Sequence, residues 1–418
     1  MIAITLLSLK FMANKKQAAL GFIFITLLID VTGFGIIIPI IPTLIQDLAN
    51  CSLNAAAVYG GWLQTTYAIM QFVCAPILGN LSDQFGRRPV LLFSLFGFAI
   101  DYLFTAFAPT IIWLFIGRAI AGITGASFST AGAYISDVST PEKKAQNFGM
   151  IGVAFGIGFI IGPALGGILG KYDVRLPFFA SAALAMINWI YGYIILPESL
   201  PKEKRRAFNW KRANPIGTLV QFKKYPVIIG LVGSIFLLYV ASHAVQTTWT
   251  YYTMYRFGWN ATAIGWSLAF VGLVVAIVQG GLIRLIIPKL GLEKSVYVGL
   301  AFYATGFLLF GLATQGWMMY AFMLVYGLGG LTMPALQGLI SNEVPQNEQG
   351  ELQGGLTSIM SIALIFGPPI MTHVFAFFSA KDAALHIPGA AMLLGSLLTL
   401  VSSFLAYNSL VRKKQVKV

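Results

Sequence analysis

Twelve apolar runs divide this sequence, and each is about as long as the roughly 20-residue helix that crosses a bilayer core. Hydrophobic residues make up 57% of the chain and charged residues only 10%, which excludes a soluble globular protein because so much apolar surface could not be buried. The sequence therefore predicts an all-α integral membrane protein with twelve transmembrane helices. The predicted spans lie at about 18–43, 55–80, 90–108, 111–136, 146–170, 177–196, 226–250, 261–287, 295–313, 317–341, 352–378 and 388–410.

Two landmarks indicate that the chain is an internal duplication. Gly162-Pro163 recurs as Gly367-Pro368, and Gly86 recurs as Gly291, in both cases 205 residues later. A repeated offset of this kind predicts two pseudo-symmetric six-helix bundles with parallel topology. We expect an N-terminal segment at 1–17, the first bundle at 18–196, a linker at 197–225, the second bundle at 226–410 and a tail at 411–418.

The basic residues give these spans a direction. Alternate loops, together with both termini, carry 22 of the 27 Lys and Arg residues, whereas the opposite loops carry four. Because positive charge marks the cytoplasmic side, the termini and the linker are predicted to be cytoplasmic. The net charge of +13 therefore comes from basic residues that set the topology of the protein in the membrane. We expect the protein to lie in a lipid bilayer and to have no nucleic-acid partner.

A compact charged loop joins the second and third spans. It reads APILGNLSDQFGRRPVLL and contains Asp83, Arg87 and Arg88. Asp137 ends the fourth span about 28 Å along the helix from Arg118, at the depth of this loop. We interpret the four residues as a cytoplasmic charge network that clamps the two halves in one state and releases them in another. An ordinary tight hairpin is the alternative.

Three ionisable residues lie inside spans, where a charge costs at least about 2.5–3.5 kcal/mol. They are Asp30 in the first span, Asp101 in the third and Arg118 in the fourth. Asp101 and Arg118 both lie about 10–12 Å inward from the hairpin at Pro109, so they share a depth and can pair. We predict that the three serve proton coupling. A salt bridge that only fixes helix packing is the alternative for the pair.

The fifth span places small residues along one face in GVAFGIGFIIGPALGG. Gly162, Gly166 and Gly167 let a neighbouring helix approach closely, and Pro163 bends the span. Elsewhere the spans carry amide and aromatic side chains that suit a cavity for a bulky, partly apolar ligand. The predicted cavity residues are Gln64, Gln71, Gln246, Trp249, Gln279, Tyr303 and Gln337.

The run G-x-L-S-D-x-F-G-R-R-P resembles the signature loop of the major facilitator superfamily. LIDVTGFGIIIPIIP, GRAIAGITGA, YISDVSTPEKKAQNFG and FGIGFIIGPALGG further resemble the tetracycline-resistance branch of drug/proton antiporters. The resemblance implies the major facilitator fold and a pump in the inner membrane that exports a small-molecule drug by alternating access, driven by protons. We also expect a monomer with no cofactor and no bound metal. The family's charged and amide positions fall on Asp30, Gln71, Asp83, Arg87, Asp101, Arg118, Asp137 and Gln279.

The chain departs from this branch at two positions. Tyr303 stands where the family has an aspartate tied to proton coupling and to the metal–tetracycline complex, and Val275 stands where it has a histidine. Proton coupling would then rest on Asp30 and Asp101. The substrate is open between tetracycline and a different amphipathic drug or metabolite.

Other classes of function have little support in the sequence. A symporter or facilitator for a small metabolite is the main alternative. The chain has no HExxH, GxSxG or Walker A pattern, which argues against an enzyme. Cys51 and Cys74 lack the neighbours of a disulfide or zinc site. The start of the chain is open between Met1 and Met12.

Overall fold

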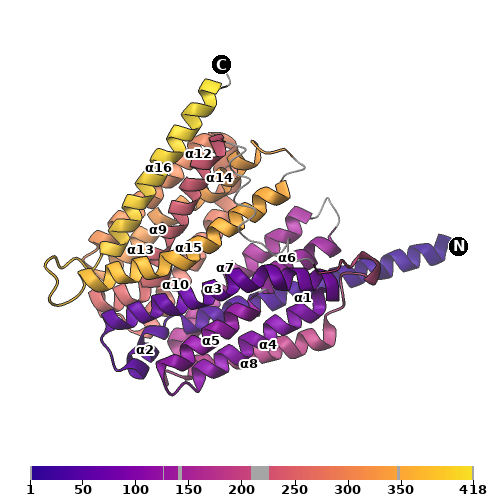
Figure 1. Ribbon diagram of the computed structural model, residues 1–418, viewed down its shortest axis with the longest axis horizontal. Helices are drawn as coiled ribbons and strands as arrows, with labels where there is room; N and C mark the ends of the chain where they lie inside the picture. The colour runs from indigo at the N-terminus through magenta and orange to yellow at the C-terminus, as the bar shows by residue number, and fades with distance from the viewer. Residues whose placement is uncertain (1, 126, 140–143, 209–225, 346–348, 417–418) are drawn as a thin grey trace.

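The computed structural model describes residues 2–125, 127–139, 144–208, 226–345 and 349–416, and the elements in these ranges are all helical. Ten helical stretches among them are long and apolar enough to cross a membrane. The second and fourth predicted spans fall on α3 and on α5 with α6 (Figure 1). The elements are α1 (Ile2–Ile37), α2 (Ile41–Ala49), α3 (Leu53–Phe85), α4 (Arg87–Ala106), α5 (Ile111–Thr124), α6 (Ser127–Val138), α7 (Lys144–Leu169), α8 (Leu176–Ile195), η1 (Lys202–Lys204), α9 (Pro226–Phe257), α10 (Ala261–Ile277), η3 (Val278–Leu282), α11 (Ile283–Leu290), α12 (Leu292–Leu312), α13 (Gly316–Leu328), η4 (Gly329–Leu331), α14 (Thr332–Ser341), α15 (Gln349–Phe378) and α16 (Ala390–Val416).

Three predicted spans are less regular than their apolar runs suggested. The fourth changes from α5 to α6 just after Gly125, which has left the helical conformation with ψ of 35°. The eighth contains the π-helical turn η3, and the tenth contains the 3₁₀ turn η4. Glycines lie at all three places, and glycine is a weak helix former because of its backbone freedom.

Gly86 and Gly291 make equivalent turns in the two halves. Each ends one helix and begins the next, with φ of 108° at Gly86 and 77° at Gly291. Positive φ is costly for residues that carry a Cβ, so both turns require glycine. The same special conformation at a distance of 205 residues supports the predicted duplication.

The two halves contact each other mainly away from the chain termini. Figure 1 shows them diverging toward the end where α1 begins and α16 finishes, which we call the termini end. Hydrogen bonds join the halves at the opposite end: Thr262 Oγ1 at the start of α10 donates to the Gly167 carbonyl (2.9 Å). Asn54 Nδ2 at the start of α3 donates to the carbonyl of Ala376 near the end of α15 (3.5 Å), and Thr65 Oγ1, further along α3, donates to the Ile365 carbonyl (3.0 Å).

Helix α7 lies between α1 and α10 and touches both closely. A Cβ on Gly166 would meet the backbone of Ile36 in α1, and a Cβ on Gly162 would meet the carbonyl oxygen of Thr32 at 2.6 Å. On the other side, a Cβ on Gly167 would lie 2.6 Å from the carbonyl oxygen of Ala261 in the second half. The small-residue face predicted from the sequence therefore serves two interfaces, one within the first half and one between the halves.

We expect Gly166→Ala to lower the stability of the protein by about 1–3 kcal/mol, because the added methyl group meets backbone that cannot rotate away. Gly152→Ala in the same helix is the matched control, since nothing lies within 4 Å of its Cβ position. It should be neutral or stabilising by up to about 1 kcal/mol. Melting temperatures of the purified variants in detergent test this, and equal values for the two would contradict it.

Candidate functional site

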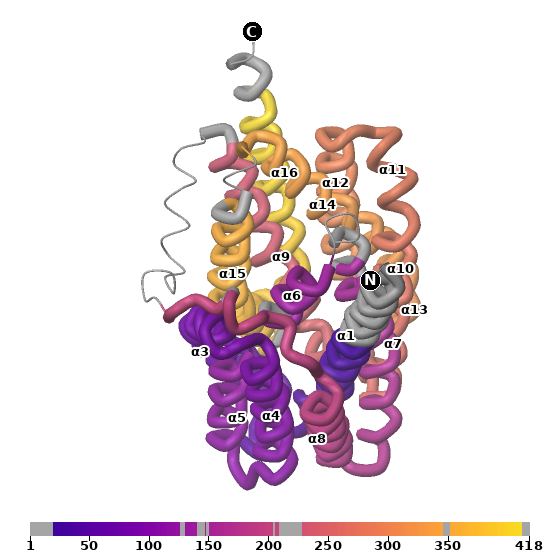
Figure 2. Tube along the Cα trace, turned by 90° about the vertical axis from the view of Figure 1, so that its right-hand side faces the viewer, coloured from indigo at the N-terminus to yellow at the C-terminus, as the bar shows by residue number. Residues whose placement is uncertain are grey.

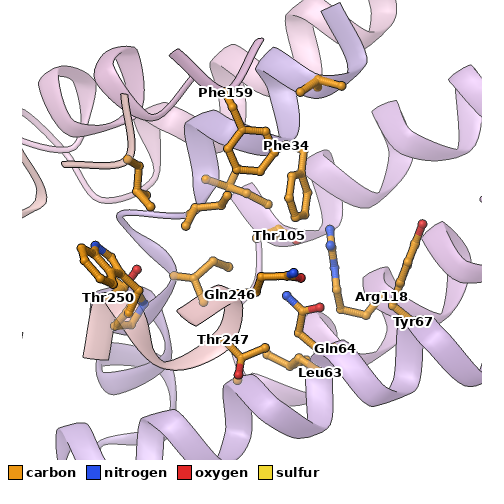
Figure 3. Close-up of a pocket in the computed structure, with 18 of the residues that line it drawn as sticks. Phe34, Leu63, Gln64, Tyr67, Thr105, Arg118, Phe159, Gln246, Thr247 and Thr250 are labelled. Carbon is orange, nitrogen blue, oxygen red and sulfur yellow. The ribbon is translucent and has the colours of Figure 1, made fainter. Parts of the chain in front are cut away.

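A cavity of about 400 Å³ lies between the two halves. The first half contributes its ionisable side chains, Asp30, Asp101 and Arg118, together with Gln64. The second half contributes the α9 segment 245–247 and 249–251 and neighbouring parts of α10 and α15. Figure 3 shows Gln64 and Arg118 facing this space from one side and Gln246 from the other. A ligand in the cavity would therefore contact both halves at once.

Asp101 and Arg118 form an ion pair between α4 and α5, as their shared depth predicted. Their side chains differ in exposure, at 1% for Asp101 and 18% for Arg118. The carboxylate is thus almost completely buried at the cavity wall, whereas the guanidinium is more open to the cavity. A buried charge is strongly disfavoured without a countercharge, so the pairing stabilises both side chains inside the first half.

Asp30 is held by a residue that the sequence analysis did not select. Asn188 of α8 donates from Nδ2 to Asp30 Oδ1 and to the Thr26 carbonyl, both at 3.1 Å. Asn188 itself is fully buried. A lone amide in the apolar run of α8 was a signal of this role, since a polar side chain at membrane depth needs a partner.

Gln71 supports the cavity from behind its wall. Its Nε2 donates to Tyr67 Oη (2.9 Å) and to the Gly125 carbonyl (3.0 Å). Tyr67 lines the cavity, and Gly125 lies where α5 gives way to α6. The predicted cavity residue Gln71 therefore orients a lining side chain instead of forming the surface itself.

Aromatic rings form the apolar part of the wall. Phe34 and Phe159 lie together at one side, with ring centroids 6.3 Å apart (Figure 3). Trp249 lines the second half and donates from Nε1 to Ser267 Oγ (3.0 Å), which fixes the indole plane. A wall of rings with a few amide and charged groups suits a ligand that is both aromatic and polar.

Three predicted cavity residues lie outside this cavity. The Tyr303 ring packs against Tyr326, with centroids 4.9 Å apart, inside the second half. Gln279 is exposed on η3, and Gln337 is exposed on α14. Gln64, Gln246 and Trp249 therefore lie on the wall of this cavity, with Gln71 behind it, and a role in substrate binding stays a prediction for all seven residues. Gln279 lies eight residues beyond the lining residue Val271, so it differs in depth, whereas Tyr303 is turned into the second half.

The predicted charge network is assembled at the termini end. Arg87 Nη1 lies 2.6 Å from Asp83 Oδ1, and its Nε lies 3.2 Å from Asp137 Oδ2. Arg88 points elsewhere and donates to the Tyr193 carbonyl (2.7 Å). The pairs join α3, α4 and α6, which all belong to the first half. Among the described residues, the network in this conformation therefore orders one bundle and makes no ion pair with the second half.

Comparison with known proteins places the chain in a family. The profile of the Major Facilitator Superfamily matches residues 23–368 and 285–417. Tetracycline resistance protein, class C, from Escherichia coli is 37% identical over 91% of this chain and 96% of its own length. The class G protein from Vibrio anguillarum is 38% identical over 89% and 93%.

Solved structures share the fold. The human organic anion transporter MFSD10 is 24% identical, with a TM-score of 0.71 over 94% of this chain and 99% of its own. The nucleoside transporter NupG is 14% identical, with a TM-score of 0.75 over 95% and 99%. This chain therefore belongs to the Major Facilitator Superfamily, in the branch of the tetracycline resistance proteins, and is a transporter and not an enzyme.

Proposed function

We propose that the protein exports tetracycline or a similar amphipathic drug from the cytoplasm in exchange for protons. The observation that carries this proposal is the cavity between the halves, which combines Asp30 and the Asp101–Arg118 pair with an aromatic wall. The tetracycline resistance proteins, 32–38% identical to it, support the same function. The proton gradient is the driving force, no cofactor takes part, and the protein works as a monomer in the inner membrane.

The arrangement of the halves supports a cycle of alternating access. The termini end faces the cytoplasm, in agreement with its basic loops. Because the inter-half hydrogen bonds of Asn54 and Thr262 lie at the opposite end, this conformation is the one that receives substrate from the cytoplasm. Closing the termini end and opening the other would release the drug outside, and a proton on Asp30 would accompany the return. Each half, 18–196 and 226–410, then moves largely as one bundle joined by the linker 197–225.

Tyr303 supports an alternative to tetracycline as the exported drug. Its ring is packed among aromatic side chains of the second half, and a phenol keeps its proton near neutral pH. The second half then offers no carboxylate for a cationic metal–drug chelate at this position. An amphipathic drug that needs no metal is therefore the alternative to tetracycline.

A growth-inhibition panel tests the function. The chain and its Asp30→Asn variant are expressed in a pump-deficient bacterium and challenged with tetracyclines, fluoroquinolones, chloramphenicol and lipophilic cations. Tetracycline resistance that disappears in the variant supports the first substrate. Resistance to other compounds only supports the metal-free alternative. A strain that gains resistance to none of them, with the protein present in the membrane, would contradict drug export.

A further inference from the structure

The first turn of α4 has an unusual cap. A helix begins with backbone N–H groups that have no partner within the helix, and a side chain of the N-cap residue normally accepts one of them. Here the N-cap is Gly86, which has no side chain. The acceptor is Glu198, far along the sequence: its Oε1 accepts the N–H of Arg87 (2.8 Å), and its Oε2 accepts that of Arg88 (3.3 Å).

Gly86 and Glu198 fit each other sterically as well. A Cβ on Gly86 would meet the Glu198 carboxylate, so the glycine provides both the positive φ and the space for this cap. The carboxylate also lies at the positive end of the helix dipole, which favours a negative charge. Arg205 Nη2 lies 3.8 Å from Glu198 Oε2.

Glu198 begins a segment that lies on the charge network. We call residues 197–206 the strap, and Figure 2 shows the chain leaving α8 and crossing the ends of the first-half helices. Ser199 Oγ donates to Asp137 Oδ2 (3.0 Å), and the Arg206 N–H donates to the Asp83 carbonyl (3.1 Å). The strap therefore touches both acids that pair with Arg87.

We propose that Glu198 is a positioning residue for the Asp83–Arg87–Asp137 network: by capping α4 it fixes the backbone of Arg87 and holds the strap on the first bundle. The start of the linker then travels with that bundle during transport. This proposal deepens the proposed function, because it rests on a cycle in which the network works at the cytoplasmic end. Glu198 is not among the residues that line the cavity.

Trypsin accessibility tests the docking of the strap without any substrate. In inverted membrane vesicles the strap offers cleavage sites after Lys202, Lys204, Arg205 and Arg206, and mass spectrometry identifies each cut. Glu198→Gln keeps the shape but removes the charge and one of the two acceptor oxygens. We expect cleavage at these sites to become roughly 5-fold faster, the lower end of the change in an equilibrium that follows from losing a helix cap. Glu203→Gln is the matched control, an exposed acid in the same segment. Equal cleavage in the two variants would overturn the proposal.

A transport measurement tests whether Glu198 positions the charge network or only supports the structure. For tetracycline uptake into the same vesicles, Glu198→Gln should lower Vmax while KM stays within about twofold, because the drug-binding wall is untouched. A raised KM with unchanged Vmax would overturn the positioning role. If the wild type carries no tetracycline, the proposed substrate fails while the cleavage comparison still decides the docking. Where Glu198→Gln does not reach the membrane, Ser199→Ala replaces it, since it removes only the contact with Asp137.

Discussion

Replacing Arg118 by leucine is expected to destabilise the protein by about 3–5 kcal/mol, because it leaves the Asp101 carboxylate buried without its countercharge. Asp101 is 1% exposed and cannot turn to water without opening the contact between α4 and α5. The free energy of unfolding, measured by detergent titration of the purified protein, gives the size of the loss. A change below about 1 kcal/mol would show that the pair is not the buried unit described above.

The double variant Asp101→Asn with Arg118→Leu separates structure from function. Removing both charges of a buried pair is often nearly neutral for stability, so we expect it to recover to within about 1 kcal/mol of the wild type. Transport should not recover, because the cavity would keep only one of its three ionisable groups, Asp30. Recovery of transport together with stability would mean that the pair only fixes helix packing, the alternative that the sequence left open.

Depth along a helix could be predicted from the sequence, and that is why the Asp101–Arg118 pair was found. Neighbouring spans joined by a short hairpin have a fixed rise per residue, so residues equally far from the turn lie at the same level. The same reasoning placed Asp137 beside Asp83 and Arg87. These are local consequences of helix geometry and hairpin length.

Direction around a helix was far less predictable. Spans that are apolar on all sides carry no polar stripe to show which face points inward. Tyr303 therefore looked as suitable for the cavity as Gln64, although its ring packs inside the second half and lies outside the cavity. Partners on distant elements were missed for a related reason: Asn188 meets Asp30, and Glu198 caps α4, only after the helices have packed.

The second large effect is expected at Asp30. In inverted vesicles, Asp30→Asn should reduce proton-driven drug uptake to background, at least about tenfold below the wild type, because a side chain that cannot titrate breaks the link between proton and drug. The amide oxygen of the asparagine can still accept the hydrogen bond from Asn188, so the packing of α1 against α8 is preserved. The variant should therefore fold and reach the membrane normally.

Exchange experiments distinguish a coupling role from a binding role for Asp30. Exchange of external labelled drug for drug already inside the vesicles needs the alternation of access but no net movement of protons. It should persist in Asp30→Asn within about threefold of the wild type if the carboxylate only couples the proton, and should vanish if the carboxylate also binds the drug. Asp47→Asn, an exposed acid on α2, is the control and should change neither measurement. Full proton-driven uptake in Asp30→Asn would remove this residue from the coupling mechanism and leave Asp101 as the carboxylate inside the first bundle that could carry it.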